Sequence, residues 1–203
     1  MHRKVRDFNL MKDYDFVEVL NCRSCGAVAP DEILNLGDQP LANSLLNQDG
    51  IYNEKKFPLV LMRCNYCTTL QLSINVNPKI LFSSYFWVTG TSRLTRDYCK
   101  DLAKKVLERS QVDKPKILEI GSNDGTLLLE FENLGAGESF GIDPAKNVIP
   151  ELSDSKVTYI PEFFTENFAK KFVAKFGQVD IVIARNVLSH VPDLNDVMRG
   201  INL

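Results

Sequence analysis

The central motif of this sequence is Ile117-Leu-Glu-Ile-Gly-Ser-Asn-Asp-Gly125. Its first residues form an apolar run interrupted only by Glu119, which is typical of a short strand buried on both faces. Gly121 and Gly125 bracket the turn that follows, where glycine lets the backbone bend sharply and lets a ligand approach closely. The motif therefore predicts a strand, a ligand-binding turn and a helix over 126–134.

The segments after this motif alternate between strand and helix patterns. Such alternation is typical of a parallel sheet whose strands are joined by right-handed crossovers. A further helix is expected before the motif, over about 93–110, because apolar residues recur there every four positions. The expected elements after the motif are a strand at 139–143, a strand at 157–160, a helix at 163–176, a strand at 179–184 and a helix at 192–201.

The composition of the glycine turn indicates which ligand it accepts. It lacks the middle glycine that dinucleotide sites use to admit a pyrophosphate, and it carries Asn123 and Asp124 instead. An acid there repels phosphate and suits a cationic sulfonium or amino group. Asp143, at the end of the second strand, can accept both ribose hydroxyls of a nucleoside. We therefore predict S-adenosylmethionine (SAM) at the carboxyl ends of the strands; the alternative is a plain turn with a surface aspartate.

Two later loops extend this predicted site. Asn186 follows the fourth strand and could contact the amino-acid part of the ligand, and Phe164, after the third strand, could form an apolar wall. A core position for Phe164 fits the pattern equally well. The predicted cofactor-binding residues are Glu119, Gly121, Asn123, Asp124, Gly125, Asp143, Pro144, Phe164 and Asn186.

Two Cys-x-x-Cys pairs precede the α/β region, Cys22 with Cys25 and Cys64 with Cys67. Four thiolates in two such pairs can close a tetrahedral zinc site, and a site made only of cysteine leaves no open position, so the zinc is predicted to be structural. The alternatives are coincidental pairs of buried cysteines or a redox pair. Short apolar runs broken by turn residues surround the pairs over 15–72, which predicts a small β-rich module whose thin core a metal would stabilise.

Composition and charge narrow the class of protein further. The net charge of -2 gives no overall attraction to nucleic acid or to an anionic membrane, and no apolar run is long enough to span a bilayer. The first residues lack the apolar region of a signal peptide, so we expect a cytoplasmic protein. The expected order is a disordered leader at 1–14, a zinc-binding domain at 15–77, an aromatic connector with a helix at 78–110 and a partial SAM-binding domain at 111–203.

Together these motifs resemble the SAM-dependent C-methyltransferases of deoxysugar biosynthesis that carry an N-terminal zinc-binding domain. Besides the cysteine pairs and the glycine turn, the resemblance rests on Leu36-Gly-Asp-Gln-Pro40-Leu-Ala-Asn43 and on Asn186-Val-Leu-Ser-His190-Val-Pro-Asp193. It implies an α/β fold with a small, β-rich zinc-binding domain of four cysteines before a Rossmann-like class I methyltransferase domain, which is incomplete here. It also implies methyl transfer from SAM to a carbon next to the ketone of a nucleotide-linked sugar, by way of an enolate.

The resemblance also implies candidate catalytic residues. Tyr85 falls where the family has an active-site tyrosine, and His190 lies in a loop that could face the substrate. A packing role for His190 is at least as compatible with its position. The family's Glu-His pair would lie beyond the fourth strand, and no such pair occurs before Leu203.

The strand count predicts a further property. The 179–184 strand is apolar on both faces and is expected to be central, yet no strand follows to cover its far edge. We therefore expect the front part of a longer enzyme, little methylation by this chain alone, and self-association through that edge. The alternatives are a non-catalytic zinc- and SAM-binding remnant or interaction module, and a nucleotide-sugar or NAD-linked enzyme on the same sheet.

Overall fold

The computed structural model describes residues 14–28, 30–150 and 155–203. The expected leader therefore lies outside the described residues except for its last position. The chain divides into two compact units. The first comprises Met1–Leu81 with Pro192–Asn195, and the second comprises Phe82–Val191 with Asp196–Leu203.

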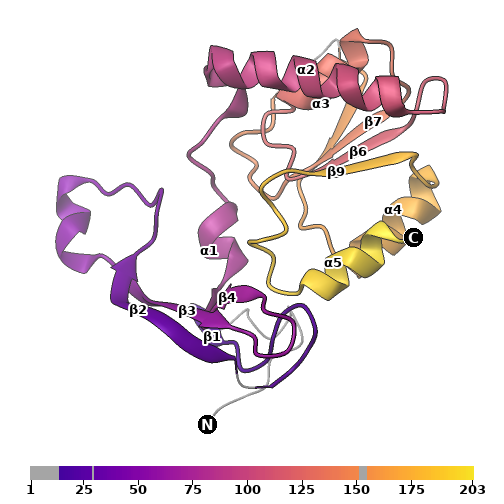
Figure 1. Ribbon diagram of the computed structural model, residues 1–203. Coiled ribbons are helices and arrows are strands. Elements are labelled where there is room, and N and C mark those ends of the chain that lie inside the picture. The colour runs from indigo at the N-terminus through magenta and orange to yellow at the C-terminus, as the bar shows by residue number, and fades with distance from the viewer. Residues whose placement is uncertain (1–13, 29, 151–154) are drawn as a thin grey trace. The chain divides into compact units, whose positions relative to one another are not determined.

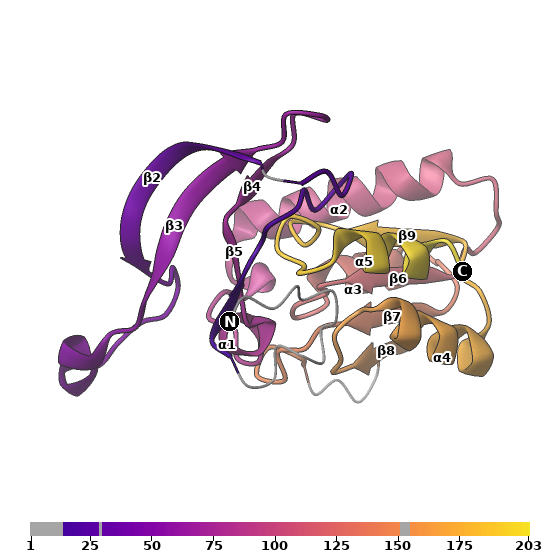
Figure 2. The same ribbon diagram turned by 90° about the horizontal axis from the view of Figure 1, so that it is seen from below.

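The first unit is built from short antiparallel strands, as its turn-rich sequence predicts. Three strands form one sheet in the order β2-β3-β4, and β1 pairs with β5. Figure 2 shows β2 and β3 as a long curved hairpin, with a 3₁₀ helix in the loop that connects the two strands. The elements are β1 (Phe16–Glu18), β2 (Asp31–Pro40), the 3₁₀ helix Gln48–Asn53, β3 (Lys56–Arg63), β4 (Leu70–Leu72), β5 (Ile74–Val76) and α1 (Pro78–Phe82), whose last residue begins the second unit.

The apolar core of this unit is small. Among the described residues, its buried apolar side chains apart from cysteines are Phe57, Val60, Ile74 and the prolines Pro30 and Pro78. Phe57 meets the ring of Phe16 edge-on at 6.0 Å between centroids. Every residue of β2 is exposed. So little buried apolar surface contributes limited free energy to folding, which is the situation in which a bound metal matters most.

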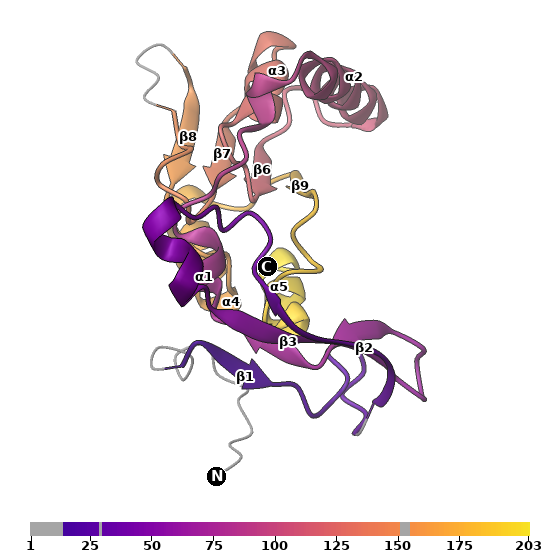
Figure 3. The same ribbon diagram turned by 90° about the vertical axis from the view of Figure 1, so that its left-hand side faces the viewer.

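The second unit is an open parallel sheet with helices on both faces. Its strand order is β8-β7-β6-β9, visible in Figure 3, and all three pairings are parallel. Figure 1 shows α2 and α3 on one face and α4 and α5 on the other. The elements are the 3₁₀ helix Thr89–Thr91, α2 (Arg93–Arg109), β6 (Ile117–Ile120), α3 (Thr126–Asn133), β7 (Ser139–Ile142), β8 (Val157–Ile160), α4 (Glu166–Phe176), β9 (Ile181–Ala184) and α5 (Leu194–Ile201), whose first two residues belong to the first unit.

The alternation of side chains along β6 divides the core of this unit into two clusters. Ile117 packs with Leu127 and Phe131 of α3 on one face. Leu118 packs with Phe140 and Phe172 on the other, where these two rings meet edge-on at 4.9 Å. Burial on both faces fixes the central strand, and with it the position of the turn that follows β6.

The predicted elements of the α/β region are all present, with shifted boundaries. The helix expected from 163 begins at Glu166, because Thr165 caps it by accepting a hydrogen bond from the backbone N–H of Phe168. Within the described residues β9 pairs with β6 alone. None of the helices in the described part of the chain is both long and apolar enough to cross a membrane.

Candidate functional site

The turn after β6 depends on its two glycines. Gly121 and Gly125 have φ angles of +69° and +73°, in the left-handed region that favours glycine. A Cβ on Gly121 would lie 2.4 Å from Cγ2 of Val187, and one on Gly125 would lie 1.9 Å from the hydroxyl oxygen of Tyr159. Both backbone conformation and space therefore require glycine at these two positions.

Asp143 joins this turn to the loop after β7. Its carboxylate accepts hydrogen bonds from the backbone N–H groups of Asn123, at 2.8 Å, and of Ala145, at 2.9 Å. Burial raises the pKa of Asp143, and these two N–H groups oppose that shift. Because β6 and β7 are adjacent and parallel, the carboxylate lies at their shared carboxyl edge, where a nucleoside ribose is held in such sheets.

The side chains of Asn123 and Asp124 bind the backbone of the segment before α2. Oδ1 of Asn123 accepts from the N–H of Thr89 at 2.9 Å, and its Nδ2 donates to the carbonyl of Trp87 at 2.8 Å. Oδ2 of Asp124 accepts from the N–H of Gly90 at 2.8 Å. A direct cofactor contact by either side chain stays a prediction, since both are already engaged within the chain.

Glu119 is fully buried on β6 and is paired with an arginine that the sequence analysis missed. Oε1 accepts from Nε and Nη2 of Arg185, at 3.1 and 2.8 Å, whereas the buried Oε2 has no hydrogen-bond partner among the described residues. Burial raises the pKa of Glu119 to about 7, against the opposing effect of Arg185. Arg185 also lies 3.4 Å from the sulfur of buried Cys99. The sequence signal that could have pointed to Arg185 is its position as a charged residue directly after the apolar strand β9.

The two candidate catalytic residues both contact one aromatic ring. The ring of Phe82 lies 6.1 Å from that of Tyr85 and 6.1 Å from that of His190, measured between centroids. The backbone of Tyr85 is held by Asn147, which the sequence analysis also missed, because a single polar residue in a loop carries no recognisable pattern. The fold thus brings together two residues that lie far apart in the sequence.

The other predicted cofactor residues have different surroundings. Phe164 packs into the core cluster beside α4, with its ring 5.9 Å from that of Phe168. Asn186 is exposed and has a left-handed φ of +53°. Pro144 is half-buried next to Asp143. Among these three, Pro144 adjoins the carboxylate at the β6–β7 edge.

The chemistry of this edge fits a nucleoside that carries a positive charge. Among residues 14–28, 30–150 and 155–203, no lysine or arginine forms an ion pair with Asp143. Its oxygens keep lone pairs for ribose hydroxyls beyond those used by the two backbone donors. Gly121 and Gly125 carry no side chain, so a ligand can approach the backbone closely at both ends of the turn. An acidic edge of this kind suits a sulfonium and disfavours a pyrophosphate.

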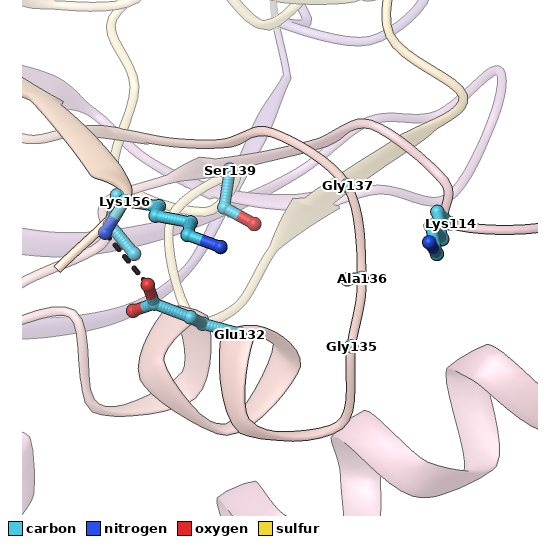
Figure 4. A pocket seen from close by; sticks show the side chains of 8 residues that line it. Lys114, Glu132, Gly135, Ala136, Gly137, Ser139 and Lys156 are labelled. Carbon is cyan, nitrogen blue, oxygen red and sulfur yellow. Dashed lines mark hydrogen bonds between the residues drawn. The ribbon is translucent and has the colours of Figure 1, made fainter.

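A separate cavity of about 270 Å³ lies at the opposite edge of the sheet. Figure 4 shows Glu132 directed at the backbone N–H of Lys156, at the amino end of β8, with Ser139 nearby. Its lining residues are Lys114, Glu132, Gly135, Ala136, Gly137, Ser139, Lys156 and Val157. None of the predicted site residues lines it.

The four predicted zinc ligands are brought together in the first unit. The sulfur atoms of Cys22, Cys25, Cys64 and Cys67 all lie within 4.8 Å of one another. The sulfur of Cys22 lies 3.5 Å from that of Cys67, and the sulfur of Cys25 lies 3.6 Å from that of Cys64. A tetrahedron with Zn–S bonds of about 2.3 Å has sulfur–sulfur edges of about 3.8 Å. The four residues therefore fit a structural zinc ion.

Hydrogen bonds to the sulfurs favour the thiolate form in the second pair. The sulfur of Cys64 accepts from the N–H groups of Tyr66 and Cys67, at 3.4 and 3.5 Å. The N–H of Cys67 is the leading cause that lowers the pKa of Cys64. The hydroxyl of Thr69 lies 3.1 Å from the sulfur of Cys67 and is the leading cause that lowers the pKa of Cys67 to about 6. Zinc binds thiolates, so both effects support Cys64 and Cys67 as ligands.

Two family models match the chain, one for each region. Residues 22–82 match a family described as "Putative zinc binding domain", and residues 92–202 match a family described as "Methyltransferase domain". The first match begins at Cys22 and includes all four cysteines of the cluster. The second includes the glycine turn, Asp143 and Arg185.

Three similar proteins have methyltransferase in their names. C-methyltransferase NovU of Streptomyces niveus is 30% identical over 183 residues, which are 89% of this chain and 43% of that protein. The chain thus spans less than half the length of this relative. The plantazolicin methyltransferase BpumL, solved with SAH, is 16% identical with a TM-score of 0.41 over 52% of this chain and 41% of that one. A SAM-dependent methyltransferase from Agrobacterium tumefaciens is 16% identical, with a TM-score of 0.37 over 98% of this chain and 59% of that one.

The family match and the geometry agree on the second region. The matched residues extend from the start of α2 through the end of α5 and contain the whole parallel sheet. Since this match covers more than half of the sequence, the chain belongs to the methyltransferase-domain family.

Proposed function

We propose that this chain supplies the SAM-binding and zinc-binding parts of a C-methyltransferase that acts on a nucleotide-linked ketosugar. The observation that carries the proposal is Asp143 at the carboxyl edge of β6 and β7, where it accepts a hydrogen bond from the N–H of Asn123 in a turn that requires glycine at both ends. The similarity to a protein named as a C-methyltransferase supports a carbon atom as the acceptor of the methyl group. The resemblance of the sequence motifs to deoxysugar enzymes supports the sugar.

The residues of the chain have distinct roles in this proposal. Bound SAM would supply an electrophilic methyl group. Asp143 would hold the ribose hydroxyls, and the backbone of the glycine turn would approach the rest of the nucleoside. A carbon next to a ketone must lose a proton before it can form the new C–C bond, so a base is needed. Tyr85 and His190, whose rings both lie 6.1 Å from that of Phe82, are the candidates for binding or deprotonating the sugar.

The zinc ion has a structural role in this proposal. All four ligands are thiolates of the chain, so no coordination position is left for a substrate. Its contribution is to hold together a unit that buries few apolar side chains. The candidate catalytic residues lie in the other unit.

Calorimetry with SAM, S-adenosylhomocysteine (SAH) and NAD tests the cofactor assignment. We expect SAH and SAM to bind and NAD not to bind. Asp143→Ala should weaken SAH binding by about 2–4 kcal/mol, because two hydrogen bonds to a charged group are lost. Asp113→Ala is the matched control, since Asp113 is exposed and lies before β6. Preferential binding of NAD would overturn the assignment.

The second candidate function is a zinc- and SAM-binding module without turnover. One observation favours it: within the described residues, neither the hydroxyl of Tyr85 nor the ring of His190 has a hydrogen-bond partner that would activate it as a base. Incubation with labelled SAM and a panel of nucleotide-linked 4-ketosugars separates the two candidates. SAH binding with no labelled sugar product from any of them would favour the module.

A further inference from the structure

The backbone of residues 85–90 is held by side chains from the two loops that flank Asp143. This segment precedes α2 and contains Tyr85 and Trp87. Its partners are Asn123 and Asp124 in the turn after β6, and Asn147 in the loop after β7. All these residues belong to the second unit.

The first clamp is Asn147, which binds both backbone groups of one residue. Its Oδ1 accepts from the N–H of Tyr85 at 2.9 Å, and its Nδ2 donates to the carbonyl of Tyr85 at 2.8 Å. A primary amide that uses both its donor and its acceptor on a single residue fixes that residue's position and orientation. Asn147 therefore fixes the backbone position from which the side chain of Tyr85 extends.

The second clamp is Asn123, which binds the segment two to four residues further on. Its Oδ1 accepts from the N–H of Thr89 at 2.9 Å and from the Thr89 hydroxyl at 3.2 Å, and its Nδ2 donates to the carbonyl of Trp87. Asn123 is 8% exposed and has a left-handed φ of +53°, so its own backbone is tightly constrained.

Asp143 connects the two clamps. It accepts from the N–H of Asn123, the residue of the second clamp, and from the N–H of Ala145, two residues before the first clamp. A ligand held by Asp143 would therefore restrain both loops, and both loops restrain residues 85–90. By thermodynamic linkage, docking of this segment must strengthen ligand binding by the factor by which the ligand strengthens docking.

We propose that Asn147 and Asn123 are positioning residues that place Tyr85 at the cofactor edge and couple its placement to binding of the nucleoside. The positioning acts through the backbone of residues 85–90. The coupling rests on the proposed function, because it requires a nucleoside at Asp143. The positioning itself does not, because the hydrogen bonds are present in the free chain.

Trp87 is the single tryptophan of the chain, and its carbonyl is held by Asn123. Trp87 is 46% exposed, so acrylamide quenching of tryptophan fluorescence reports on the docking of residues 85–90. The variants are Asn147→Ala, Asn147→Gln, which restores both amide groups on a longer side chain, and the control Lys146→Ala at the exposed neighbouring position. Each is measured without and with SAH.

In the unmodified chain, SAH should reduce the quenching of Trp87. Asn147→Ala should increase quenching in the free chain and weaken SAH binding roughly tenfold, within the usual range of coupling between sites. Asn147→Gln should recover part of the protection from quenching and part of the SAH affinity, and Lys146→Ala should change neither quantity. If methylation is measurable, Asn147→Ala should lower kcat as well as cofactor affinity, because Tyr85 is displaced.

The outcomes separate this inference from the proposed function. Quenching in the free Asn147→Ala chain that equals that of the unmodified chain would overturn the positioning role, whether or not SAH binds. Increased quenching with unchanged SAH affinity would overturn the coupling. Failure of SAH to bind the unmodified chain would overturn the proposed function and the coupling together, and the free-chain comparison would still decide the positioning role.

Discussion

Thr68 occupies in the second cysteine pair the left-handed backbone position that Gly26 occupies in the first. Their φ angles are +62° and +78°, and each residue directly follows the last cysteine of its pair. The backbone N–H of Gly26 donates to the carbonyl of Cys22 at 2.9 Å, and that of Thr68 donates to the carbonyl of Cys64 at 3.0 Å. The two turns are equivalent, but only one has the residue that this conformation favours.

Thr68→Gly should stabilise the zinc-loaded protein. A β-branched residue in the left-handed region costs about 1–2 kcal/mol, and the greater entropy of unfolded glycine offsets part of the gain, which leaves about 0.5–1 kcal/mol. Thr68 is exposed, so no packing is lost. Urea denaturation measures the change, and Gly26→Ala is the reciprocal variant, expected to destabilise. A lower stability of Thr68→Gly would show that its side chain matters in a way the geometry does not reveal.

Protein purified without added metal should contain one zinc ion per chain. The four sulfur atoms lie within 4.8 Å of one another, close enough to ligate one tetrahedral zinc ion. Cys64→Ser should abolish zinc binding and unfold the region over 15–72, because binding free energy is folding free energy in such modules. Metal analysis by mass spectrometry measures the ratio, and Cys99→Ala, in the other unit, should retain the zinc. A metal-free preparation whose folding is indifferent to chelator would contradict this prediction.

Arg185→Met should destabilise the protein more at neutral pH than at acid pH. Burial raises the pKa of Glu119 from 4.5 to about 7, so the folded state holds this proton more tightly than the unfolded state. The resulting stability is fully present below pH 4.5 and is lost as the pH rises through about 7. Without Arg185 the pKa rises further, and the buried charge at neutral pH should cost about 3–5 kcal/mol.

Urea denaturation at about pH 5 and pH 8 measures this dependence. The matched control is Glu119→Gln in the Arg185→Met background, which removes the titrating group and should remove most of the difference between the two pH values. Equal destabilisation by Arg185→Met at both values would mean that the arginine contributes packing around Cys99 rather than charge.

The sequence predicted those parts of the site that follow from strand geometry or ligand spacing. Asp143 lies at the predicted edge because parallel strands end together, and the cysteines meet because two Cys-x-x-Cys pairs are a recognisable ligand pattern. Arg185 and Asn147 were missed because their partners lie on distant segments. The preference of Asn123 for the backbone of residues 87–89 was equally hidden, since it depends on where a preceding segment folds back.

Gly125→Ala should destabilise the protein through two separable effects, and Tyr159 distinguishes them. The left-handed φ of +73° alone costs alanine about 1–2 kcal/mol. The added methyl would also lie 1.9 Å from the hydroxyl oxygen of Tyr159, so the ring or the turn must move.

That hydroxyl is buried and has no hydrogen-bond partner among the described residues, and burial raises its pKa. Tyr159→Phe by itself should therefore be neutral or stabilising in the free chain, since it removes an unsatisfied polar group. In the Gly125→Ala background it should recover only part of the steric loss, because Cζ and Cε1 of the ring would still lie 2.6 and 2.7 Å from the added methyl, and it should leave the backbone part. Urea denaturation of the two single variants and the double variant gives the coupling energy. Strictly additive effects would mean that the hydroxyl contributes nothing to the steric loss, which the ring carbons and the backbone angle of Gly125 would then explain.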